Sequence, residues 1–308
     1  MNKDVIMNSI FQGIWPAMFT PLDESGNPSL KEVEKLTDKL VTEGVPGLYI
    51  LGSTGQGVLF SQAQREEVAN VVLQTVAKRI PVMVQVGSMT STESSALAKH
   101  AQKAGASAVS SVGPIYFGGG ADMVLEHYRQ IAESTDLPFF PYQLGNNSIQ
   151  GNLESFIDEL MKMPQVAGMK LTTTDLLTIS AVHNHAGERL RLFSGADELL
   201  CHSTLCGTVG AIGSMYNFWW KECNYVRNAF MDGDFELGRS FMLEFQRLIF
   251  QFLPNVWTFF RQAMQHIYQI DIGPAVRPVG NTNKIWSEAE LHRVLDQFQA
   301  AAQFNQPV

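Results

Sequence analysis

The stretch Val166-Ala167-Gly168-Met169-Lys170 is a short apolar run that ends in a single lysine. It follows Met163-Pro164 and precedes the polar cluster Thr172-Thr173-Thr174-Asp175, a pattern that favours a buried strand and then the start of a helix. An apolar pocket at a strand tip disfavours the charged form of an amine, and a neutral amine can attack a ketone to form a Schiff base. Taken alone, the window more often indicates a surface lysine that happens to follow a strand.

The same strand-then-helix pattern recurs on both sides of this stretch. The predicted strands cover Gly13–Phe19, Leu48–Leu51, Pro81–Val86, Ala108–Val112, Phe139–Tyr142, Val166–Lys170, Arg191–Ser194 and Val209–Gly213. The predicted helices cover Ser29–Glu43, Ser61–Val76, Ser91–Ala104, Asp122–Ser134, Leu153–Met163, Asp175–His185, a short helix from Glu198 and a helix from about Phe218. Ser29 and Ser61 are predicted N-caps, and Gln64 completes a capping box with Ser61.

Eight such units are the number that closes a (β/α)8 TIM barrel. A doubly wound open sheet is the alternative, but no G-x-G-x-x-G follows the first strand. The rest of the chain reads as the helices Phe235–Phe252, Val256–Ile270 and Ser287–Phe304. We therefore expect one domain over residues 1–308, with a barrel over 13–231 and a C-terminal helical extension over 232–308.

Composition excludes several classes of partner. Of the 308 residues, 45% are hydrophobic, which is enough for a large core without covalent staples. The net charge of −8 and the lack of a basic block argue against a nucleic-acid partner. The three cysteines have no zinc-site spacing and are expected to be reduced thiols. No signal peptide and no membrane-length apolar run are apparent, so a cytoplasmic location is expected.

A barrel places its active site at the C-terminal ends of the strands, so the residues just after each predicted strand are the candidates. Gly52-Ser53-Thr54-Gly55-Gln56-Gly57 follows the second strand, and its backbone N–H groups and hydroxyls could hold a carboxylate, or it could be an ordinary turn. Tyr142 follows the fifth strand, where it could relay protons or simply be a buried structural tyrosine. Tyr116 follows the fourth strand.

Further candidates follow the seventh and eighth strands. Gly195, Asp197 and Glu198 come after the seventh, and Gly213-Ser214-Met215-Tyr216-Asn217 comes after the eighth. A pair of carboxylates at a strand tip suits a substrate with many hydroxyl groups, which need acceptors. Because Asp197 and Glu198 are adjacent, one of them could instead cap the next helix.

These pieces together resemble the pyruvate-dependent class I aldolase family that contains N-acetylneuraminate lyase and dihydrodipicolinate synthase. The matching segments are Gly52-Ser53-Thr54-Gly55, Tyr142, Gly168-Met169-Lys170 with Thr172, Gly195-Ala196-Asp197-Glu198, and Gly210 to Asn217. They occur in the family's order and at its spacing over nearly the whole chain. The last two segments are similar to the sialic acid lyase branch. The synthase branch carries an arginine five residues after its catalytic tyrosine, where this chain has Asn147.

The resemblance implies reversible aldol cleavage of N-acetylneuraminate to N-acetylmannosamine and pyruvate. Lys170 would form the Schiff base, Tyr142 would relay protons with Tyr116 as a further catalytic candidate, and Ser53 with Thr54 would hold the carboxylate of the keto acid. Five residues would orient the sugar chain: Thr172, Gly195, Asp197, Glu198 and Ser214. The family also implies a homotetramer that uses no metal and no dissociable cofactor.

Three positions depart from the family pattern. Gln56 stands where glutamate is usual, Gln143-Leu144-Gly145 replaces Asn-Ile-Pro or His-Ile-Pro, and Met215 stands where the lyase branch usually has threonine. The second departure matters most, because that strand tip shapes the pocket around Tyr142. Two other functions therefore stay open: an aldolase or hydratase of the same family that acts on another 2-keto sugar acid, and a catalytically silent regulator that binds pyruvate or a sugar acid.

Overall fold

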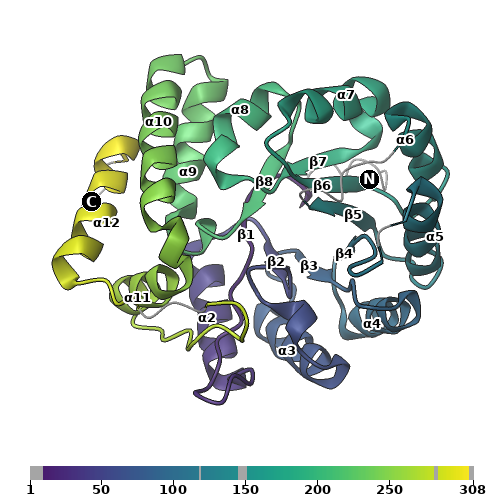
Figure 1. The fold of residues 1–308 in the computed structure, drawn as a ribbon, viewed down its shortest axis with the longest axis horizontal. Helices are drawn as coiled ribbons and strands as arrows, with labels where there is room; N and C mark the ends of the chain where they lie inside the picture. Colours follow the sequence, from purple (N-terminus) through teal and green to yellow (C-terminus); the bar gives the residue numbers. More distant parts are fainter. Residues whose placement is uncertain (1–9, 118, 145–150, 281–283, 305–308) are drawn as a thin grey trace.

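The computed structural model describes residues 10–117, 119–144, 151–280 and 284–304, and within them eight parallel strands form a barrel (Figure 1). The strands are β1 (Gly13–Pro16), β2 (Leu48–Ile50), β3 (Val82–Gln85), β4 (Ala108–Val112), β5 (Phe139–Leu144), β6 (Gly168–Thr172), β7 (Arg191–Ser194) and β8 (Gly210–Gly213). From β2 to β8 each strand pairs with the next one along the chain, and β8 pairs with β1. An isolated bridge from Ala17, just past β1, to Tyr49 of β2 closes the ring. The predicted (β/α)8 barrel is confirmed.

Helices cover the outside of the barrel. They are α2 (Leu30–Glu43), α3 (Gln62–Val76), α4 (Ser91–Ala104), α5 (Ala121–Ala132), α6 (Leu153–Met161), α7 (Leu176–Ala186), α8 (Leu200–Leu205) and α9 (Tyr216–Met231). Three short 3-10 turns accompany them: η1 (Gly57–Leu59), η2 (Gly187–Arg189) and η3 (Asp197–Leu199).

Several predicted boundaries need correction. The capping box of Ser61 and Gln64 is present, whereas Ser29 stands at its N-cap without a side-chain capping bond, its N–H donating instead to the Pro21 carbonyl. Strand β5 continues two residues past Tyr142 because Gln143 and Leu144 pair with β6. β1 ends at Pro16, where its pairing with β8 ends, although the sequence favoured a strand to Phe19.

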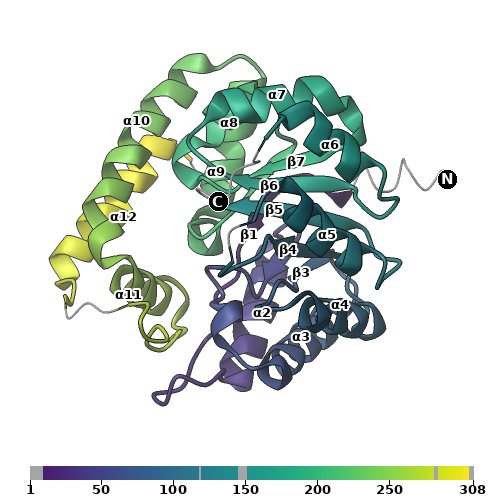
Figure 2. The same ribbon diagram turned by 45° about the vertical axis from the view of Figure 1, so that its right-hand side comes forward.

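The C-terminal helical extension forms a layer of helices on one side of the barrel, which both ribbon views show (Figures 1 and 2). It consists of α10 (Phe235–Phe252), the 3-10 turn η4 (Leu253–Asn255), α11 (Val256–Tyr268) and α12 (Glu288–Ala302). Apolar rings attach it to the barrel: Phe298 of α12 stacks on Trp219 of α9 with a centroid separation of 3.7 Å. Phe252 and Phe259 stack in the same way at the turn from α10 to α11.

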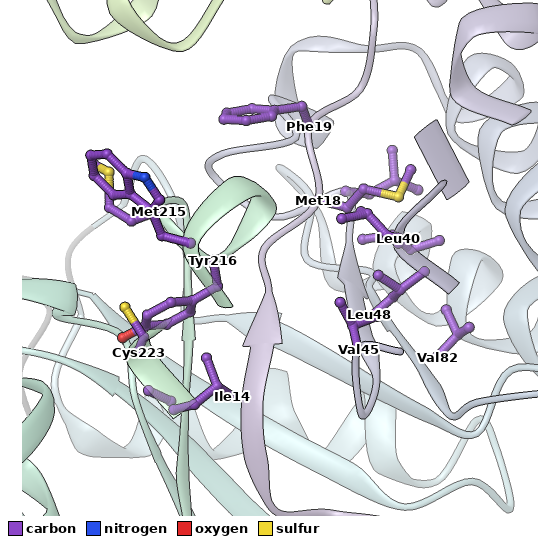
Figure 3. Close-up of a cluster of buried hydrophobic side chains, with 14 of the residues drawn as sticks. Ile14, Met18, Phe19, Leu40, Val45, Leu48, Val82, Met215, Tyr216 and Cys223 are labelled. Atoms are coloured by element: carbon purple, nitrogen blue, oxygen red, sulfur yellow. The ribbon is translucent and has the colours of Figure 1, made fainter. Parts of the chain in front are cut away.

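The core has two parts. Inside the barrel, buried side chains fill the space below the strand tips: Phe11, Trp15, Tyr49, Met83, Phe140, Phe193 and Ile212. Outside it, aliphatic and aromatic side chains pack between the strands and the helices. Figure 3 shows part of this outer core, with Tyr216 and Cys223 of α9 beside Ile14 of β1. Within the described ranges, no helix combines the length and apolarity needed to span a membrane.

Candidate active site

Lys170 lies inside the barrel, near the C-terminal end of β6. The alternation of the strand directs Gly168, Lys170 and Thr172 to one face. Only 4% of Lys170 is exposed, and its Nζ lies 4.3 Å from the ring centroid of Tyr142 and 4.4 Å from that of Tyr49. The structure therefore gives the lysine a largely dry environment walled by two phenol rings.

Tyr142 is the cross-strand neighbour of this lysine. The register of β5 and β6 sets Tyr142 directly opposite Lys170. Its hydroxyl shares a hydrogen bond of 3.2 Å with the Thr172 hydroxyl, and its backbone carbonyl accepts a bond of 3.3 Å from the Tyr128 hydroxyl. One hydrogen bond at the hydroxyl of Tyr142 and one at its backbone carbonyl fix its ring next to the Lys170 amine. In the bond with Thr172, the Tyr142 hydroxyl can act as either donor or acceptor.

Tyr49 is a site residue that the sequence reasoning missed. It lies at the middle of β2, fully buried, with its ring at 87° to that of Tyr142 and its hydroxyl donating to Ser110 at 3.2 Å. Burial, reinforced by the neighbouring Tyr142, raises the pKa of the Tyr49 phenol well above its usual range, so it stays neutral. A signal was present: Tyr49 is a lone polar-tipped residue in an apolar run, just before the glycine loop.

The glycine loop passes close to this tyrosine and curls tightly. A Cβ on Gly52 would lie 2.4 Å from the Tyr49 ring, and one on Gly57 would lie 2.0 Å from the Leu51 carbonyl oxygen, so neither position has room for a side chain. Ser53 at the tip of the loop is exposed, and Thr54 is half-buried. The hydroxyl of Thr54 meets that of Ser214 at 2.6 Å, which joins the ends of β2 and β8.

Gln56, the first departure from the family pattern, has a structural role here. Its side chain is 94% buried (6% exposed), and its Oε1 accepts a 2.7 Å hydrogen bond from the N–H of Val276. The next residue back, Gly55, is held through its carbonyl by the Thr20 hydroxyl at 2.8 Å. These bonds anchor the glycine loop to the segment that follows α11 and to the segment that follows β1.

Gly195 is required by the packing of its neighbours. A Cβ at this position would lie 1.8 Å from the Thr172 Oγ1 and 3.0 Å from the Lys170 Cε. The absence of a side chain therefore lets the end of β7 approach the lysine closely. Any larger residue would push Thr172 away from Tyr142.

Asp197 is buried behind this glycine, with 6% of it exposed. Its Oδ2 accepts a 2.9 Å hydrogen bond from the N–H of Met215, whereas its Oδ1 is buried with no partner among the described residues. A Cβ on Gly213 would lie 1.5 Å from that Oδ1, so this glycine makes room for the carboxylate. Burial raises the pKa of Asp197 to about 7, which lets it either donate or accept near neutral pH.

A pocket of about 280 Å³ lies next to the lysine, with one polar and one apolar wall. Lys170, Tyr142 and Thr172 do not line it, but Gly195, which packs against Lys170 and Thr172, does. The polar wall consists of the predicted residues Ser53, Thr54, Gly195, Asp197, Glu198 and Ser214, together with Met215. The adjacent acids thus line one pocket, and neither Asp197 nor Glu198 is the N-cap of α8, which is Leu199. The apolar wall, which the sequence reasoning missed, comes from the extension: Ile249, Leu253, Val256, Trp257 and Phe260.

Tyr116 is placed differently from the other predicted residues. It is 75% exposed on the loop after β4, and its ring packs edge-on against Phe117. Within the described residues, no ring contact or hydrogen bond links it to Lys170 or Tyr142. Asn147, on which the comparison with the synthase branch depended, and Gly145, the last residue of the Gln143-Leu144-Gly145 departure, lie outside the described residues. Gln143, the other end of that departure, donates to the Tyr128 hydroxyl at 3.1 Å.

The arrangement combines a buried amine, a fixed phenol and a hydroxyl-rich loop at one end of a pocket. An amine kept from water can act as a nucleophile toward a carbonyl carbon, and a phenol within reach can move protons. No group of three or more His, Cys, Asp or Glu suitable for a metal ion is found in the part of the chain that the structure describes.

Comparison with known proteins identifies the family. The profile of the dihydrodipicolinate synthetase family matches residues 10–297. N-acetylneuraminate lyase from Citrobacter koseri is 30% identical over 240 residues, which are 77% of this chain and 80% of the lyase. The sialic acid aldolase structure from Ruminococcus gnavus covers 96% of this chain and is itself 99% covered, with a TM-score of 0.88 at 22% identity.

A Pseudomonas aeruginosa structure, described as a candidate dihydrodipicolinate synthetase, covers 94% of this chain and is 99% covered, with a TM-score of 0.83 at 23% identity. Fold similarity at this level is thus shared by both branches and does not separate them. The profile match over almost the entire chain, together with the lyase relative, is decisive at the level of the family. This chain belongs to the dihydrodipicolinate synthetase family, and it is an enzyme of the lyase class, an aldolase.

Proposed function

We propose that this enzyme cleaves N-acetylneuraminate reversibly to N-acetylmannosamine and pyruvate. The observation that carries the proposal is the position of Lys170, buried between the rings of Tyr49 and Tyr142 and adjoining a pocket lined by Asp197 and Glu198. The amine serves the keto-acid end of the substrate, and the acids serve a chain of hydroxyl groups. The lyase relative of 30% identity supports the same substrate.

In the proposed reaction, the neutral Lys170 amine attacks the C2 ketone, and loss of water gives an iminium ion. Ser53, Thr54 and the N–H groups of their loop hold the adjacent carboxylate. The iminium accepts the electron pair of the C3–C4 bond as that bond breaks, and the C4 hydroxyl loses its proton toward Tyr142. The aldehyde product leaves, the remaining enamine is protonated at C3, and hydrolysis returns free Lys170 and pyruvate.

The remaining pocket residues would bind the sugar chain. Asp197, Glu198 and Ser214 line the same pocket, so substrate hydroxyls would find acceptors there. Thr172 and Gly195 would determine how closely the chain approaches Lys170, because they lie in contact beside it. The apolar wall with Trp257 and Phe260 offers a surface for an apolar substituent such as a methyl group.

A second candidate is an aldolase or hydratase that acts on a different 2-keto sugar acid. Gln143 favours it, since this residue departs from the family pattern and donates to Tyr128 under the catalytic tyrosine.

We propose that Tyr116 also acts in catalysis, although its exposed position requires a neighbouring surface to bring it to a substrate.

Trapping with pyruvate and borohydride tests the chemistry separately from the substrate. We expect one lactyl-sized mass increase per chain, on the peptide that contains Lys170, and no increase in Lys170→Ala. A panel of 2-keto sugar acids, scored by pyruvate release, then tests the substrate. A label on another residue would refute the Schiff-base role of Lys170, whereas trapping without cleavage of N-acetylneuraminate would favour the second candidate.

The tail-binding role of Asp197 has its own test. Asp197→Ala should depress cleavage of the full substrate strongly, because a site built to pair hydroxyls loses affinity when its own polar groups are unpaired. Trapping of pyruvate should be almost unchanged, since pyruvate has no tail. Equal losses in both assays would show that Asp197 supports the barrel and not the substrate.

A further inference from the structure

A second pocket opens at the opposite end of the barrel from Lys170. It is lined by residues at the N-terminal ends of strands, among them Gly13 and Arg191, which begin β1 and β7, and Val209, which precedes β8. Its outer wall comes from α7 and α9, and its volume is about 940 Å³. We call it the floor pocket, and nothing in the proposed lyase reaction uses it.

Among its described lining residues, the floor pocket has more cationic than acidic side chains, in a protein that is acidic overall. Arg191 and Arg227 line it, and burial lowers the pKa of both guanidinium groups. Among the described residues that line the pocket, Glu188 is the sole acid, and its side chain is 78% exposed. It lies 3.3 Å from Arg191, whose side chain is 11% exposed. Among the described residues that line the pocket, no carboxylate is therefore paired with Arg227.

Arg227 is 94% buried (6% exposed) and under-bonded. Its Nη2 donates to the Thr208 carbonyl at a long 3.3 Å, and its Nε is buried without a partner among the described residues. The hydroxyl of Thr208, itself 5% exposed, and the indole Nε1 of Trp220 are also buried and unpaired. The three residues line the same pocket, and three buried polar groups without partners, one of them on the cationic side chain itself, are costly unless a ligand satisfies them.

The neighbouring side chains add donors and no negative charge. Asn224 and Asn228 lie on the same helix as Arg227, three residues before it and one residue after it, and both line the pocket. The ring of His183 packs so closely on Gly207 that a Cβ there would lie 2.3 Å from it, which fixes the imidazole at the rim. Amides and an imidazole can orient an anion without repelling it.

We propose that the floor pocket binds a small anion through a carboxylate or phosphate group, with Arg227 as the principal partner. The planar guanidinium suits both groups because its donors form a fork that matches their oxygens. Thr208 and Trp220 complete the set as donors of single hydrogen bonds. The site is separate from the carboxylate-binding loop at Ser53, which lies at the other end of the strands.

Isothermal titration calorimetry on the full chain tests this site, with inorganic phosphate in one arm and citrate in the other at constant ionic strength. We expect saturable binding of phosphate, of citrate or of both. The anion that binds more tightly shows whether the pocket prefers a phosphate or a carboxylate group. Arg227→Gln should weaken it about 10- to 100-fold, the loss typical of a hydrogen bond to a charged group. Binding in neither arm would overturn the proposal.

Two matched variants separate the floor pocket from other anion sites. Arg239→Gln removes an arginine that is 70% exposed on α10 and should leave binding unchanged. Ser53→Ala should also leave anion binding unchanged. If Ser53→Ala abolished binding while Arg227→Gln retained it, the anion would be bound in the active site and the proposal would be refuted. If Arg227→Gln fails to fold by circular dichroism, Asn224→Asp adds a carboxylate to the half-buried wall and should weaken binding severalfold. Unchanged affinity in a folded Asn224→Asp would count against the site.

Discussion

Two phenols flank Lys170, and their hydroxyl groups have different partners. The Tyr142 hydroxyl meets Thr172 at the mouth of the site, whereas the Tyr49 hydroxyl donates to Ser110 deeper in the barrel. In the proposed reaction, only the first exchanges a proton with the substrate. The second holds a ring against the amine.

Tyr142→Phe therefore tests the proton relay directly. It deletes one hydroxyl and keeps the ring, and we expect turnover to fall on the order of a hundredfold or more. Tyr49→Phe is the matched control and should have a much smaller effect on turnover. Pyruvate release under saturating substrate measures both, with circular dichroism to verify the fold. Near-normal turnover in Tyr142→Phe would move the relay to another group, with Tyr116 the first to examine.

The raised pKa of the Asp197 carboxyl predicts how the stability of the protein depends on pH. Its pKa is about 7 in the folded protein and near 3.8 in the unfolded chain, so the native state binds more protons between these values. Stability contributed by this residue is therefore present below pH 4 and is lost as the pH rises toward 7. The difference corresponds to about 4 kcal/mol at most, taking ~1.4 kcal/mol for each pKa unit.

The comparison of wild type with Asp197→Asn isolates this effect. The asparagine oxygen can still accept from Met215, but it does not titrate. Urea unfolding between pH 4 and pH 8 should show wild type losing stability relative to the variant as the pH rises. A constant difference across this range would mean that Asp197 is ionised throughout.

The sequence located site residues where a local pattern marks a strand tip. Lys170 ends an apolar run, and Gly195-Ala196-Asp197-Glu198 follows another, so their positions followed from chain order alone. Tyr49 was missed because its role depends on the barrel bringing β2, β5 and β6 to one interior, and a single strand does not reveal that. The unpaired Oδ1 of Asp197 likewise depends on Gly213 from another strand.

At the scale of elements, local chemistry predicted the strands and most helices. The capping box at Ser61 and the period of the strand–helix unit are both properties of short windows. The start of α9 was placed two residues late because its anchors come from elsewhere: Asp197 accepts from Met215, and the Asn217 side chain donates to Ala17. The apolar wall of the pocket could not be foreseen, because it depends on how α10 and α11 pack against the barrel.

The contact between α12 and α9 provides a test of whether the extension and barrel unfold together. Phe298 is fully buried and stacks on Trp219, so Phe298→Ala should destabilise the protein by about 3–5 kcal/mol. We expect one cooperative transition at lower denaturant concentration in tryptophan fluorescence. Phe250→Ala, which removes a ring that is 73% exposed on α10, should change stability by no more than about 0.5 kcal/mol. Two separated transitions in Phe298→Ala would show that the extension unfolds independently.

At the scale of the whole molecule, an apolar patch surrounds the predicted residue Tyr116. Met89 follows β3, and Ile115, Tyr116 and Phe117 follow the adjacent β4, with exposed fractions of 60%, 38%, 75% and 71%. Neighbouring apolar side chains exposed to this extent mark an interaction surface in most proteins. We propose that the homotetramer implied by the family resemblance buries this patch and brings Tyr116 against another copy of the chain.

Light scattering after size-exclusion chromatography measures that assembly. We expect a mass close to four times the 34.2 kDa of one chain. Tyr116→Asp introduces a charge that is costly to bury, so it should shift the mass toward dimers or monomers. Tyr116→Phe keeps the ring and should preserve the assembly, while a loss of turnover in this variant would support a catalytic role for the hydroxyl. Leu177→Asp, at a position 81% exposed on α7, controls for a general effect of charge on the surface. A tetramer that persists in Tyr116→Asp would exclude this patch as an interface and leave its exposed rings to another partner.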